Sequence, residues 1–402
     1  IQMSQLKVLV VGASIAGPTT AYWFAKAGAK VTVIERSPQL RTNGQNVDIR
    51  TTGVTVMRKM VGMEAAVRAR MTQMDGINFV RENGHPYATI KATGNPDQQS
   101  LVSEYEIFRG DLAKILFDMT KEIENIKYVF GEQVVSMQSG KDDGPITVEF
   151  ANGSPTSEYD LVVACDGAFS RTRAIGFGCS VRSYVKPMNF WAAYFALGQD
   201  LVQGGKMGQA YSAPGGRFVA VGAGPGPLYM NHAVLMGFSP SDNDTMISFR
   251  AAMKEGDAAL KQFVAQHYKG AGWKTDEVIE GMMEAEDFYA NEAVQVRPPN
   301  LYKGRCVLVG DAGYAGSAGA GTTLAMTGAY VLAGEIKRHR ENLIPPFFSA
   351  FMAPQTAWGI WLRNSIFAFI TWTRILEIGQ KFYAGSFAST DKYRLPDYEW
   401  EE

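Results

Sequence analysis

The sequence predicts an α/β fold in which a parallel-sheet βαβ domain is interrupted by a mainly antiparallel sheet domain and followed by C-terminal helices. Three observations lead to this prediction. A strand–helix–strand pattern occupies Lys7–Arg36, aromatic and small residues alternate within Tyr184–Phe238, and a buried-strand pattern returns at Arg305–Val309. We therefore expect one domain to be completed from the C-terminal third of the 402-residue chain.

The chain begins with a βαβ unit. Lys7–Val11 is a short apolar run typical of a buried parallel strand, and Ile15–Gly28 changes to helical spacing and stops at a glycine. Lys30–Ile34 returns to strand character, and Glu35 closes the unit.

Further elements follow in the first half of the chain. Helical spacing predicts helices at Thr52–Met71 and Asp111–Ile123. Ile126–Val148 alternates in the manner of antiparallel strands, a turn is expected at Ala151–Gly153, and Asp160–Cys165 has the pattern of a buried strand.

The middle of the chain has a different composition. Aromatic residues alternate with small ones in Phe190–Phe195, and Gly and Pro recur through Pro214–Pro227, which favours an antiparallel sheet in a separate layer. Helices are expected at Asp242–Gly270 and Thr275–Ala285, and the Pro298–Pro299 pair ends the region.

These patterns divide the chain into three parts. The first domain comprises residues 1–75, 101–180 and 286–345, the sheet domain comprises residues 76–100 and 181–285, and residues 346–402 form a C-terminal helical segment. In that segment Asn364–Thr373 lacks charge, but Arg363 and Arg374 bound it at about half the length of a bilayer span. We expect a helix packed on the body and no transmembrane span; a membrane-surface or dimer contact is the alternative.

Charge and cysteine content exclude several classes of function. Lys and Arg total 39 against 40 acidic residues, and no basic block suggests binding to nucleic acid or to an anionic membrane. Cys165, Cys179 and Cys306 are too few and too scattered for a disulfide framework, and with only 4 histidines no metal site is expected. The first strand leaves no room for a secretory signal, so we expect a cytoplasmic protein.

A glycine-rich turn joins the first strand to its helix. It is Gly12-Ala13-Ser14-Ile15-Ala16-Gly17, a G-x-S-x-x-G version of the dinucleotide-binding fingerprint. The first glycine permits the tight turn, the last lets the helix pack closely, and Ser14 is small enough for a pyrophosphate to approach. With Glu35 placed to accept ribose hydroxyls, the motif predicts FAD or NAD binding; a tight turn without a ligand is the alternative.

A second strand end favours a flavin. Asp311 directly follows a buried strand and precedes a glycine-rich loop, Gly313–Gly321, which opens a helix near Thr322. A carboxylate there can accept a hydrogen bond from a ribityl hydroxyl. The loop and the helix N-terminus present free N–H groups to an electron-rich ring or a phosphate.

The order of these motifs resembles that of a known family. Gly12–Gly17 with Glu35 and Arg36, then Phe108–Asp111, Asp166-Gly167 and Gly310-Asp311, are similar in order and separation to the class A flavoprotein monooxygenases. Within this p-hydroxybenzoate hydroxylase-like family, the chain most resembles the branch that contains the tetracycline-inactivating monooxygenase. The resemblance covers nearly the whole length.

The resemblance implies roles for single residues. Glu35 would hold the adenosine ribose, Arg109 would reach the flavin's phosphate and ribityl region, and Asp311 would contact the ribityl chain. Asp48, within Gly44–Arg50, would lie beside the isoalloxazine or ribityl chain, and Asp166-Gly167 matches a pair that the family associates with FAD and NAD(P)H.

We therefore predict a Rossmann-like domain that binds FAD tightly but non-covalently. The expected cofactor-binding residues are Gly12, Ser14, Ile15, Ala16, Gly17, Glu35, Arg36, Gln45, Asp48, Arg109, Asp166, Gly167, Gly310, Asp311, Gly319, Ala320, Gly321 and Thr322. Three of these residues have an alternative role without a ligand. Arg109 could pair with a surface carboxylate, Asp166 could be an ordinary strand exit, and Asp48 could cap a turn.

The loop after Asp311 departs from the family's pattern. Relatives usually carry a proline and then Gly-x-Gly, whereas Ala312–Gly321 contains no proline and is shorter. Because glycine loses more conformational freedom on ordering, we expect this loop, which lies against the flavin ring in relatives, to be more mobile here.

The resemblance also implies an activity. In the family NAD(P)H reduces the flavin, oxygen adds to its C4a carbon, and the (hydro)peroxide formed transfers one oxygen atom to the substrate. We expect an FAD-dependent monooxygenase that acts on an aromatic or polycyclic small molecule by hydroxylation, epoxidation or Baeyer–Villiger insertion, with no catalytic residue required beyond the flavin. NADPH and NADH are both open, since no second nucleotide-binding βαβ unit is visible.

Other functions remain as alternatives. The altered loop motivates a redox-silent cyclase or isomerase that keeps the fold, and a flavin-binding protein without enzymatic activity is a further class. A halogenase would need a Trp-x-Trp-x-Ile-Pro segment, which Trp358-Gly359-Ile360-Trp361 does not match.

Substrate contacts are expected on the sheet domain, whose aromatic strand faces would look across at the flavin. The candidates are Phe190, Tyr194, Tyr211, Arg217, Tyr229 and His232, with packing on the sheet as the alternative for each. Such a lining favours a flat, apolar or phenolic molecule.

Overall fold

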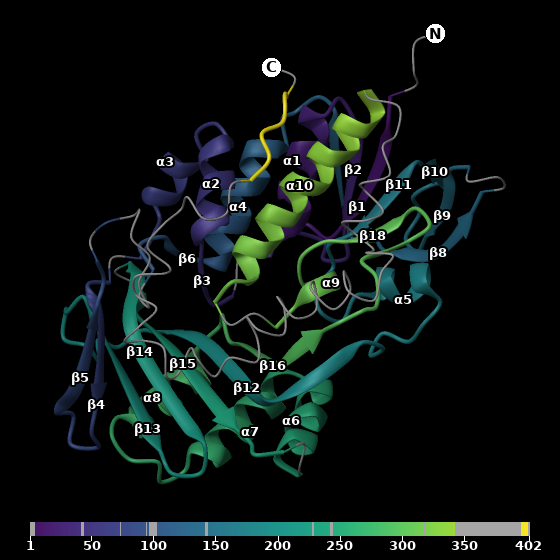
Figure 1. Cartoon of the computed structure of the whole chain (residues 1–402). Helices are drawn as coiled ribbons and strands as arrows, with labels where there is room; N and C mark the ends of the chain where they lie inside the picture. The colour runs from purple at the N-terminus through teal and green to yellow at the C-terminus, as the bar shows by residue number, and fades with distance from the viewer. Residues whose placement is uncertain are drawn as a thin grey trace, which may run out of the picture.

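The structure is a computed structural model, and it describes residues 5–41, 44–72, 74–93, 95, 103–140, 144–226, 229–241, 244–316, 319–341 and 395–400. For residues 225, 226, 229, 230, 340 and 341 only the backbone is described. Figure 1 shows an α/β part built on a mainly parallel sheet above a part built on a large sheet that is antiparallel except for the pair of β13 (Met207–Ala213) and β4 (Gly76–Val80); we call it the antiparallel sheet. The predicted fold class is confirmed.

The parallel sheet brings together strands from both ends of the chain. Among the described residues its order is β17 (Tyr302–Lys303), β18 (Cys306–Leu308), β11 (Leu161–Ala164), β1 (Lys7–Val11), β2 (Lys30–Glu35) and β7 (Ile126–Phe130). All neighbours are parallel except β17 and β18. The chain passes from β1 to β2 on one side while β11 lies on the other, and ligands of open α/β sheets bind at the carboxyl ends of strands at such a switch point.

The two faces of this sheet are covered differently. The helices that pack on one face are α1 (Ala16–Lys26), α2 (Thr51–Lys59), α3 (Met63–Arg68), α4 (Arg109–Thr120) and α10 (Gly321–Glu341). The other face packs against an antiparallel sheet of β8 (Val134–Ser139), β9 (Ile146–Phe150) and β10 (Ser157–Tyr159). Alternate residues of β1 therefore enter different cores: Val8 and Val10 face the helices, and Leu9 and Val11 face the strands.

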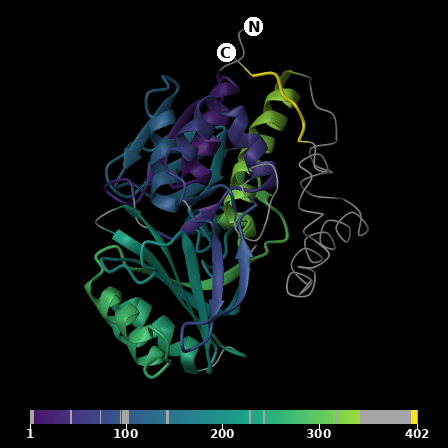
Figure 2. The same cartoon turned by 90° about the vertical axis from the view of Figure 1, so that its left-hand side faces the viewer.

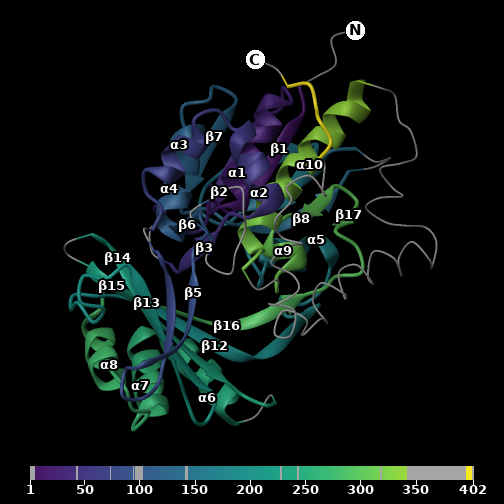
Figure 3. The same cartoon turned by 60° about the vertical axis from the view of Figure 1, so that its left-hand side comes forward.

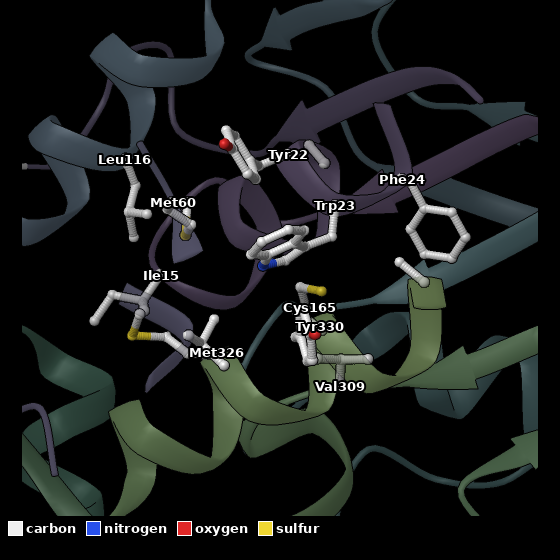
Figure 4. Packing of buried hydrophobic residues seen from close by; sticks show 14 of the residues in the cluster. Ile15, Tyr22, Trp23, Phe24, Met60, Leu116, Cys165, Val309, Met326 and Tyr330 are labelled. Carbon is white, nitrogen blue, oxygen red and sulfur yellow. The ribbon is translucent and has the colours of Figure 1, made fainter. Parts of the chain in front are cut away.

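Trp23 of α1 lies at the centre of the helix-side core (Figure 4). Its side chain is 1% exposed, and its ring makes an edge-to-face contact with Tyr330 of α10 at 4.8 Å between centroids. Ile15, just before α1, and Met326, near the start of α10, are buried in the same core. The core therefore holds together two helices whose N-termini lie at the strand ends.

The antiparallel sheet carries its own helical layer on one face only. Its strand order is β16 (Tyr289–Val296), β12 (Val185–Leu197), β15 (Tyr229–Phe238), β14 (Arg217–Gly226), β13 (Met207–Ala213), β4 (Gly76–Val80) and β5 (Pro86–Lys91). α6 (Asp244–Glu255), α7 (Asp257–Tyr268) and α8 (Thr275–Glu284) cover the face turned away from the parallel sheet (Figures 2 and 3). Trp191, Ala193 and Phe195 of β12 point into this layer.

A two-stranded sheet connects the two parts. β3 (Asn46–Asp48) pairs with β6 (Glu106–Phe108), and it lies between the parallel sheet and the antiparallel sheet (Figure 3). Because β6 runs directly into α4, this ribbon fixes where Arg109 begins its helix.

Several sequence predictions require correction. Ile126–Phe130 is not an antiparallel strand: it pairs in parallel with β2 at the edge of the first sheet, where a strand alternates because one face is less covered. The helix expected over Thr52–Met71 is divided at Gly62, and the one expected over Asp242–Gly270 is divided at Gly256. Both glycines have positive φ, 83° and 109°, which an α-helix does not accommodate.

One expected domain boundary also shifts. β16 falls within 286–345, the stretch assigned to the first domain, yet it pairs along β12 and belongs to the antiparallel sheet. Local patterning could not show this, because strand pairing is decided by a partner about a hundred residues away. We propose that the first domain resumes after β16; the other boundaries stay as proposals.

Residues 395–400 form a C-terminal strap across α1, α2 and α10. Trp400 lies 4.7 Å from Trp23 between ring centroids, and the Tyr330 hydroxyl donates to the Pro396 carbonyl at 2.8 Å. Tyr398 donates to Glu335 at 2.7 Å, and Lys59 pairs with Asp397. The rest of the expected C-terminal helical segment, Asn364–Thr373 included, lies outside the described residues. In the part of the chain that the structure describes, no helix is long and apolar enough to cross a membrane.

The strap predicts an unusual effect of a substitution in α10. A methyl group at Gly334 would lie 2.2 Å from the Tyr398 ring, so Gly334→Ala should destabilise the protein by about 1–3 kcal/mol through overpacking. In a Tyr398→Ala background the same substitution should instead stabilise by up to about 1 kcal/mol, because alanine is the better helix former. Urea unfolding of the four proteins tests this; an equal loss in both backgrounds would show that the ring is not the cause.

Candidate functional site

The turn after β1 has no room for side chains. Gly12 has φ 108°, and a Cβ there would lie 2.5 Å from the Cys165 carbonyl oxygen at the end of β11. A Cβ on Gly17 would lie 1.7 Å from the Gly12 carbonyl oxygen. Both glycines are therefore required by the close approach of the first turn of α1 to the ends of β1 and β11, and the free N–H groups of that turn lie at the switch point.

Glu35 is fixed beside this turn. Its carboxylate accepts from the Ala13 N–H and from the Ser37 N–H, both at 3.0 Å, and the residue is 6% exposed. Each carboxylate oxygen can accept a second hydrogen bond. Glu35 is thus held in one orientation at the end of β2 with acceptor capacity left over.

Asp311 follows the buried strand β18 and begins the short helix α9 (Asp311–Tyr314). The side chain is open to solvent, yet the surrounding protein desolvates it enough to raise its pKa, an effect that Arg109 partly opposes. Solvent exposure and a raised pKa occur together when protein surrounds a carboxylate on most sides and solvent reaches it on one. A Cβ on Gly321, at the start of α10, would lie 3.8 Å from its Oδ1. Gly310, with φ 68°, brings this strand end within contact of Ala16.

Gln45 and Arg109 meet at the entry to α4. The Arg109 N–H donates to the Gln45 carbonyl at 2.9 Å, and Gly44 lies against the Arg109 side chain. The Gln45 Oε1 atom is buried and has no hydrogen-bond partner among the described residues. Buried acceptors in proteins are nearly always satisfied, so a donor from a ligand fits this position.

Asp48 forms an ion pair with Arg50, whose Nη2 lies 2.7 Å from Oδ2. Burial raises the pKa of Asp48, and Arg50 opposes the rise. A Cβ on Gly319 would lie 3.7 Å from the same Oδ2, which places the turn before α10 beside Asp48. The Arg50 N–H also donates to the Thr323 hydroxyl at 2.9 Å, so β3 and α10 are tied together.

Asp166 serves its own loop. Its carboxylate accepts from the Ser170 hydroxyl at 2.5 Å and from the Thr172 N–H at 3.0 Å, and so begins α5 (Arg171–Phe177). Gly167 has φ 87°, as a tight strand exit requires. This geometry favours the structural alternative for the pair; a cofactor contact stays a prediction.

Sequence reasoning missed Arg173. This arginine is 0% exposed and donates to the carbonyls of Ala312 at 2.7 Å and of Ala168 and Val181 at 2.9 Å. It therefore ties the loop after Asp166 to the residue that follows Asp311. An arginine in a short helix next to a strand end gives no distinctive sequence signal, because such residues are usually exposed.

The remaining predicted residues have defined positions. Ser14, Ile15 and Ala16 lead into α1, Arg36 is exposed after β2, and Ala320 and Thr322 lie at the start of α10. The glycine-rich loop expected at Gly313–Gly321 is only partly a loop, since Asp311–Tyr314 form the short helix α9. The Tyr314 hydroxyl packs against Gly328 and donates to the Leu324 carbonyl at 3.3 Å, which holds that turn against α10. Residues 317–318 lie outside the described part.

The antiparallel sheet presents one open face to these strand ends. Ala233 and Leu235 of β15 point into the helical layer, so His232 points to the opposite face. The His232 ring packs on Phe108 at 5.0 Å, next to Arg109. Tyr194 lies on the same face, because Ala196 pairs with His232 and side chains repeat every second residue.

The other substrate candidates do not all lie on the open face. The prediction for Tyr211 is wrong: the side chain is buried in the helical layer, and its hydroxyl donates to the Ala271 carbonyl at 3.0 Å. The prediction for Arg217 is also wrong, because its guanidinium bonds the Pro214 and Lys269 carbonyls and closes the end of α7. Phe190 stacks on Phe238 at 5.1 Å on the open face. The side chain of Tyr229 lies outside the described part.

Within the described ranges, no three His, Cys, Asp or Glu side chains come together as metal ligands would. A depression on the far side of the antiparallel sheet, lined by Ala258, Lys261 and Met283, is wide open and has no reactive cluster. The strand ends facing the open sheet face are therefore the candidate site.

Comparison with known proteins shows the family of the chain. A family model described as "FAD binding domain" matches residues 5–339. The FAD-dependent monooxygenase asL4 of Sarocladium schorii is 34% identical, over 84% of this chain and 77% of its own length. Monooxygenase CTB7 of Cercospora beticola is 31% identical, over 99% of this chain and 98% of its own.

Solved structures show the same fold. The tetracycline destructase Tet(55) is 26% identical, with a TM-score of 0.73 over 99% of this chain and 100% of that chain. CtdE, solved in complex with FAD and a substrate, is 18% identical, with a TM-score of 0.66 over 98% of this chain and 94% of that chain.

His232 predicts a pH dependence of stability. Burial lowers its pKa from 6.5 to about 4, with Asp287 opposing, so the unfolded chain binds a proton that the folded protein rejects. Stability is full above pH 6.5 and falls as the pH drops towards 4, by about 2 kcal/mol at pH 4.5. Urea unfolding at pH 7 and 4.5 measures this. His232→Gln should lose that part of the difference, and exposed His85→Gln should keep it; identical behaviour would contradict the assignment.

Proposed function

Because this chain belongs to the FAD-binding-domain family of flavin-dependent monooxygenases, we propose that it inserts one oxygen atom from O2 into an aromatic or polycyclic small molecule, with NAD(P)H as electron donor. The proposal rests on the way in which residues from separate segments of the chain come together. Gly12–Gly17 and Glu35 lie at the carboxyl ends of β1 and β2, Asp311 lies past the end of β18, and the charge of Arg109, at the start of α4, acts on Asp311.

The residues present fit FAD. We assign the free N–H groups at the start of α1 to the pyrophosphate, the spare acceptors of Glu35 to the adenosine ribose, and Asp311 to ribityl hydroxyls. The buried acceptor of Gln45 supports a hydroxyl or N–H donor from the cofactor nearby. Arg109 supplies positive charge beside Asp311 for a phosphate.

When bound, the flavin supplies the electron-transfer and oxygen chemistry. The protein's part is to bind, orient and exclude water. The N-terminus of α10, at Gly321–Thr323, presents N–H groups and a positive dipole end that favour negative charge on the ring. The Val296 N–H donates to the Ala315 carbonyl at 3.1 Å, which holds the loop after α9 against the antiparallel sheet.

A flat substrate suits the open sheet face. Ala192, Ala196, Ala210 and Ala220 share this face with Tyr194 and His232 by strand register, and their small side chains leave room above the sheet. His232 stays neutral at physiological pH, since desolvation lowers its pKa to about 4, and can donate or accept one hydrogen bond. The name of the similar protein Tet(55), a tetracycline destructase, also favours a polycyclic substrate.

A redox-silent isomerase is the second candidate. Gly316 and Gly319, with φ 110° and 70°, occupy the loop after Asp311 where relatives usually carry a proline, and this change would alter how the flavin ring is held. Turnover that is unaffected by removing O2 and NAD(P)H would select this candidate.

The proposal is tested on the purified protein. We expect about one FAD per chain, flavin reduction by NADPH or NADH in stopped-flow mixing, and faster reduction with a fitting compound from a phenolic and polycyclic panel. Product formed under ¹⁸O2 should carry one labelled atom. Protein that binds no flavin, or turnover without oxygen, would defeat the proposal.

Glu35 predicts the strength of FAD binding. Glu35→Gln replaces a charged acceptor with a neutral amide, and charge-assisted hydrogen bonds contribute about 1.5–3 kcal/mol, so the FAD dissociation constant should rise about tenfold or more. Fluorescence titration of the flavin-free protein measures it. Glu149→Gln, a carboxylate on β9 that bonds Ser136, is the matched control and should bind FAD as the parent does. Equal affinity in both variants would remove Glu35 from the site.

A further inference from the structure

Three polar side chains lie along one edge of the open sheet face. Tyr194 of β12 pairs directly with Tyr289 of β16, and Ala192 pairs with Asn291. Tyr289 and Asn291 therefore share the face of Tyr194. Ala290 and Glu292, which alternate with them, point to the helical layer, where Glu292 pairs with Arg250 at 2.6 Å. We call Tyr194, Tyr289 and Asn291 the polar strip.

The strip has unused hydrogen-bonding capacity. The two hydroxyls and the carboxamide make no hydrogen bond with any residue that the structure describes, and all three side chains are half-buried. Phenols on the opposite face behave differently: the Tyr211 hydroxyl bonds the Ala271 carbonyl, and the Tyr268 hydroxyl bonds the Phe218 and Met236 carbonyls. The hydrogen-bonding groups of the strip are therefore available to a ligand on the open face.

The two phenol rings of the strip lie against each other. Their rings stack at 6.5 Å with an interplanar angle of 26°. Desolvation, with a smaller contribution from Tyr289, raises the pKa of Tyr194 to about 12. The Tyr194 hydroxyl thus keeps its proton at neutral pH and can donate it to a carbonyl or phenolic oxygen.

At the level of Tyr194 and Ala192, the face beyond β12 is apolar. Across the sheet from Tyr194 come Val234 and then Ala220, and from Ala192 come Met236 and Phe218. A ligand lying across these two levels would contact hydrogen-bonding groups along β16 and β12 and hydrocarbon on β15 and β14, while His232 lies farther along β15, next to Phe108.

The strip also leads to the flavin side of the site. Gln295 follows on the same face of β16, and a Cβ on Gly316 would lie 2.8 Å from its side chain. Gly316 belongs to the loop after Asp311. The polar strip is therefore on the edge of the face that adjoins this loop.

We propose that the polar strip binds the oxygen-bearing edge of a flat polycyclic substrate and so fixes which edge is oriented toward the loop after Asp311. The ligand class is a fused aromatic molecule with phenol or carbonyl oxygens along one edge and hydrocarbon elsewhere. The proposal rests on the proposed function in one respect, that the open sheet face is the substrate site.

The test measures binding without turnover. The probes are 1,8-dihydroxyanthraquinone, which has three oxygens along one edge, and anthracene, which has the same ring frame without oxygen. Their dissociation constants are measured by quenching of protein fluorescence on the FAD-loaded protein, without NAD(P)H. The variants are Tyr194→Phe, Tyr289→Phe and Asn291→Ala, with Tyr211→Phe as the matched control, a phenol on the opposite face.

We expect each strip variant to bind the dihydroxyanthraquinone about 3–10-fold more weakly, with anthracene affinity changed less than twofold. Tyr211→Phe should leave both affinities unchanged. Flavin reduction by NADPH without probe should match the parent in every variant, which distinguishes substrate recognition from a nicotinamide contact.

Other outcomes overturn the proposal. Equal weakening of both probes would make the strip ordinary packing, an equal effect of Tyr211→Phe would make it a stability effect, and no binding of either probe to the parent would remove the site. Failure of the monooxygenase function is seen separately, as absence of NAD(P)H-dependent oxygen transfer, because the binding measurement needs neither reductant nor turnover.

Discussion

The close approach of backbone to backbone at the end of β1 is the constraint on which the site depends. Gly12 lies against the carbonyl that ends β11, and Gly17 lies against Gly12 itself, so α1 can begin only where no side chain intervenes. This contact sets the first turn of α1 beside Glu35, and the same helix contacts Gly310 through Ala16. A larger residue at either glycine would separate the strand ends that have to act together.

Tertiary contacts make a single site from remote segments. Arg50 bonds Thr323, the loop after α9 bonds β16, and Phe108 packs on His232. The first contact links two segments of the nucleotide-binding part that are some 270 residues apart in the chain. The other two link this part to the antiparallel sheet. These contacts and the β3–β6 ribbon hold the open face of the sheet over the strand ends.

The period of two in a β-strand decides which side chains can meet a ligand. Tyr194 and Tyr211 are both tyrosines in strands of the same sheet. Tyr194 is on the face turned toward the strand ends, whereas Tyr211 is buried on the opposite face, against Ala271 and Trp273 just before α8. The sequence alone could not separate them, because a shift of one residue in register exchanges the two faces. The role of Arg217 could not be predicted either, since the Lys269 carbonyl that it bonds follows the end of α7, some 50 residues later.

Sequence by itself determined the βαβ start, the glycine turn with Glu35, the return of a buried strand before Asp311, and hence the family and its flavin. These are local patterns whose chemistry requires particular residues at short spacing. Only the tertiary structure decided that β7 joins the parallel sheet and β16 the antiparallel sheet. It also decided that Arg173 is buried and bonds the Ala312 carbonyl, and that Tyr289 and Asn291 share a face with Tyr194. Strand partners and burial arise from contacts between segments far apart in the chain, and no local pattern encodes them.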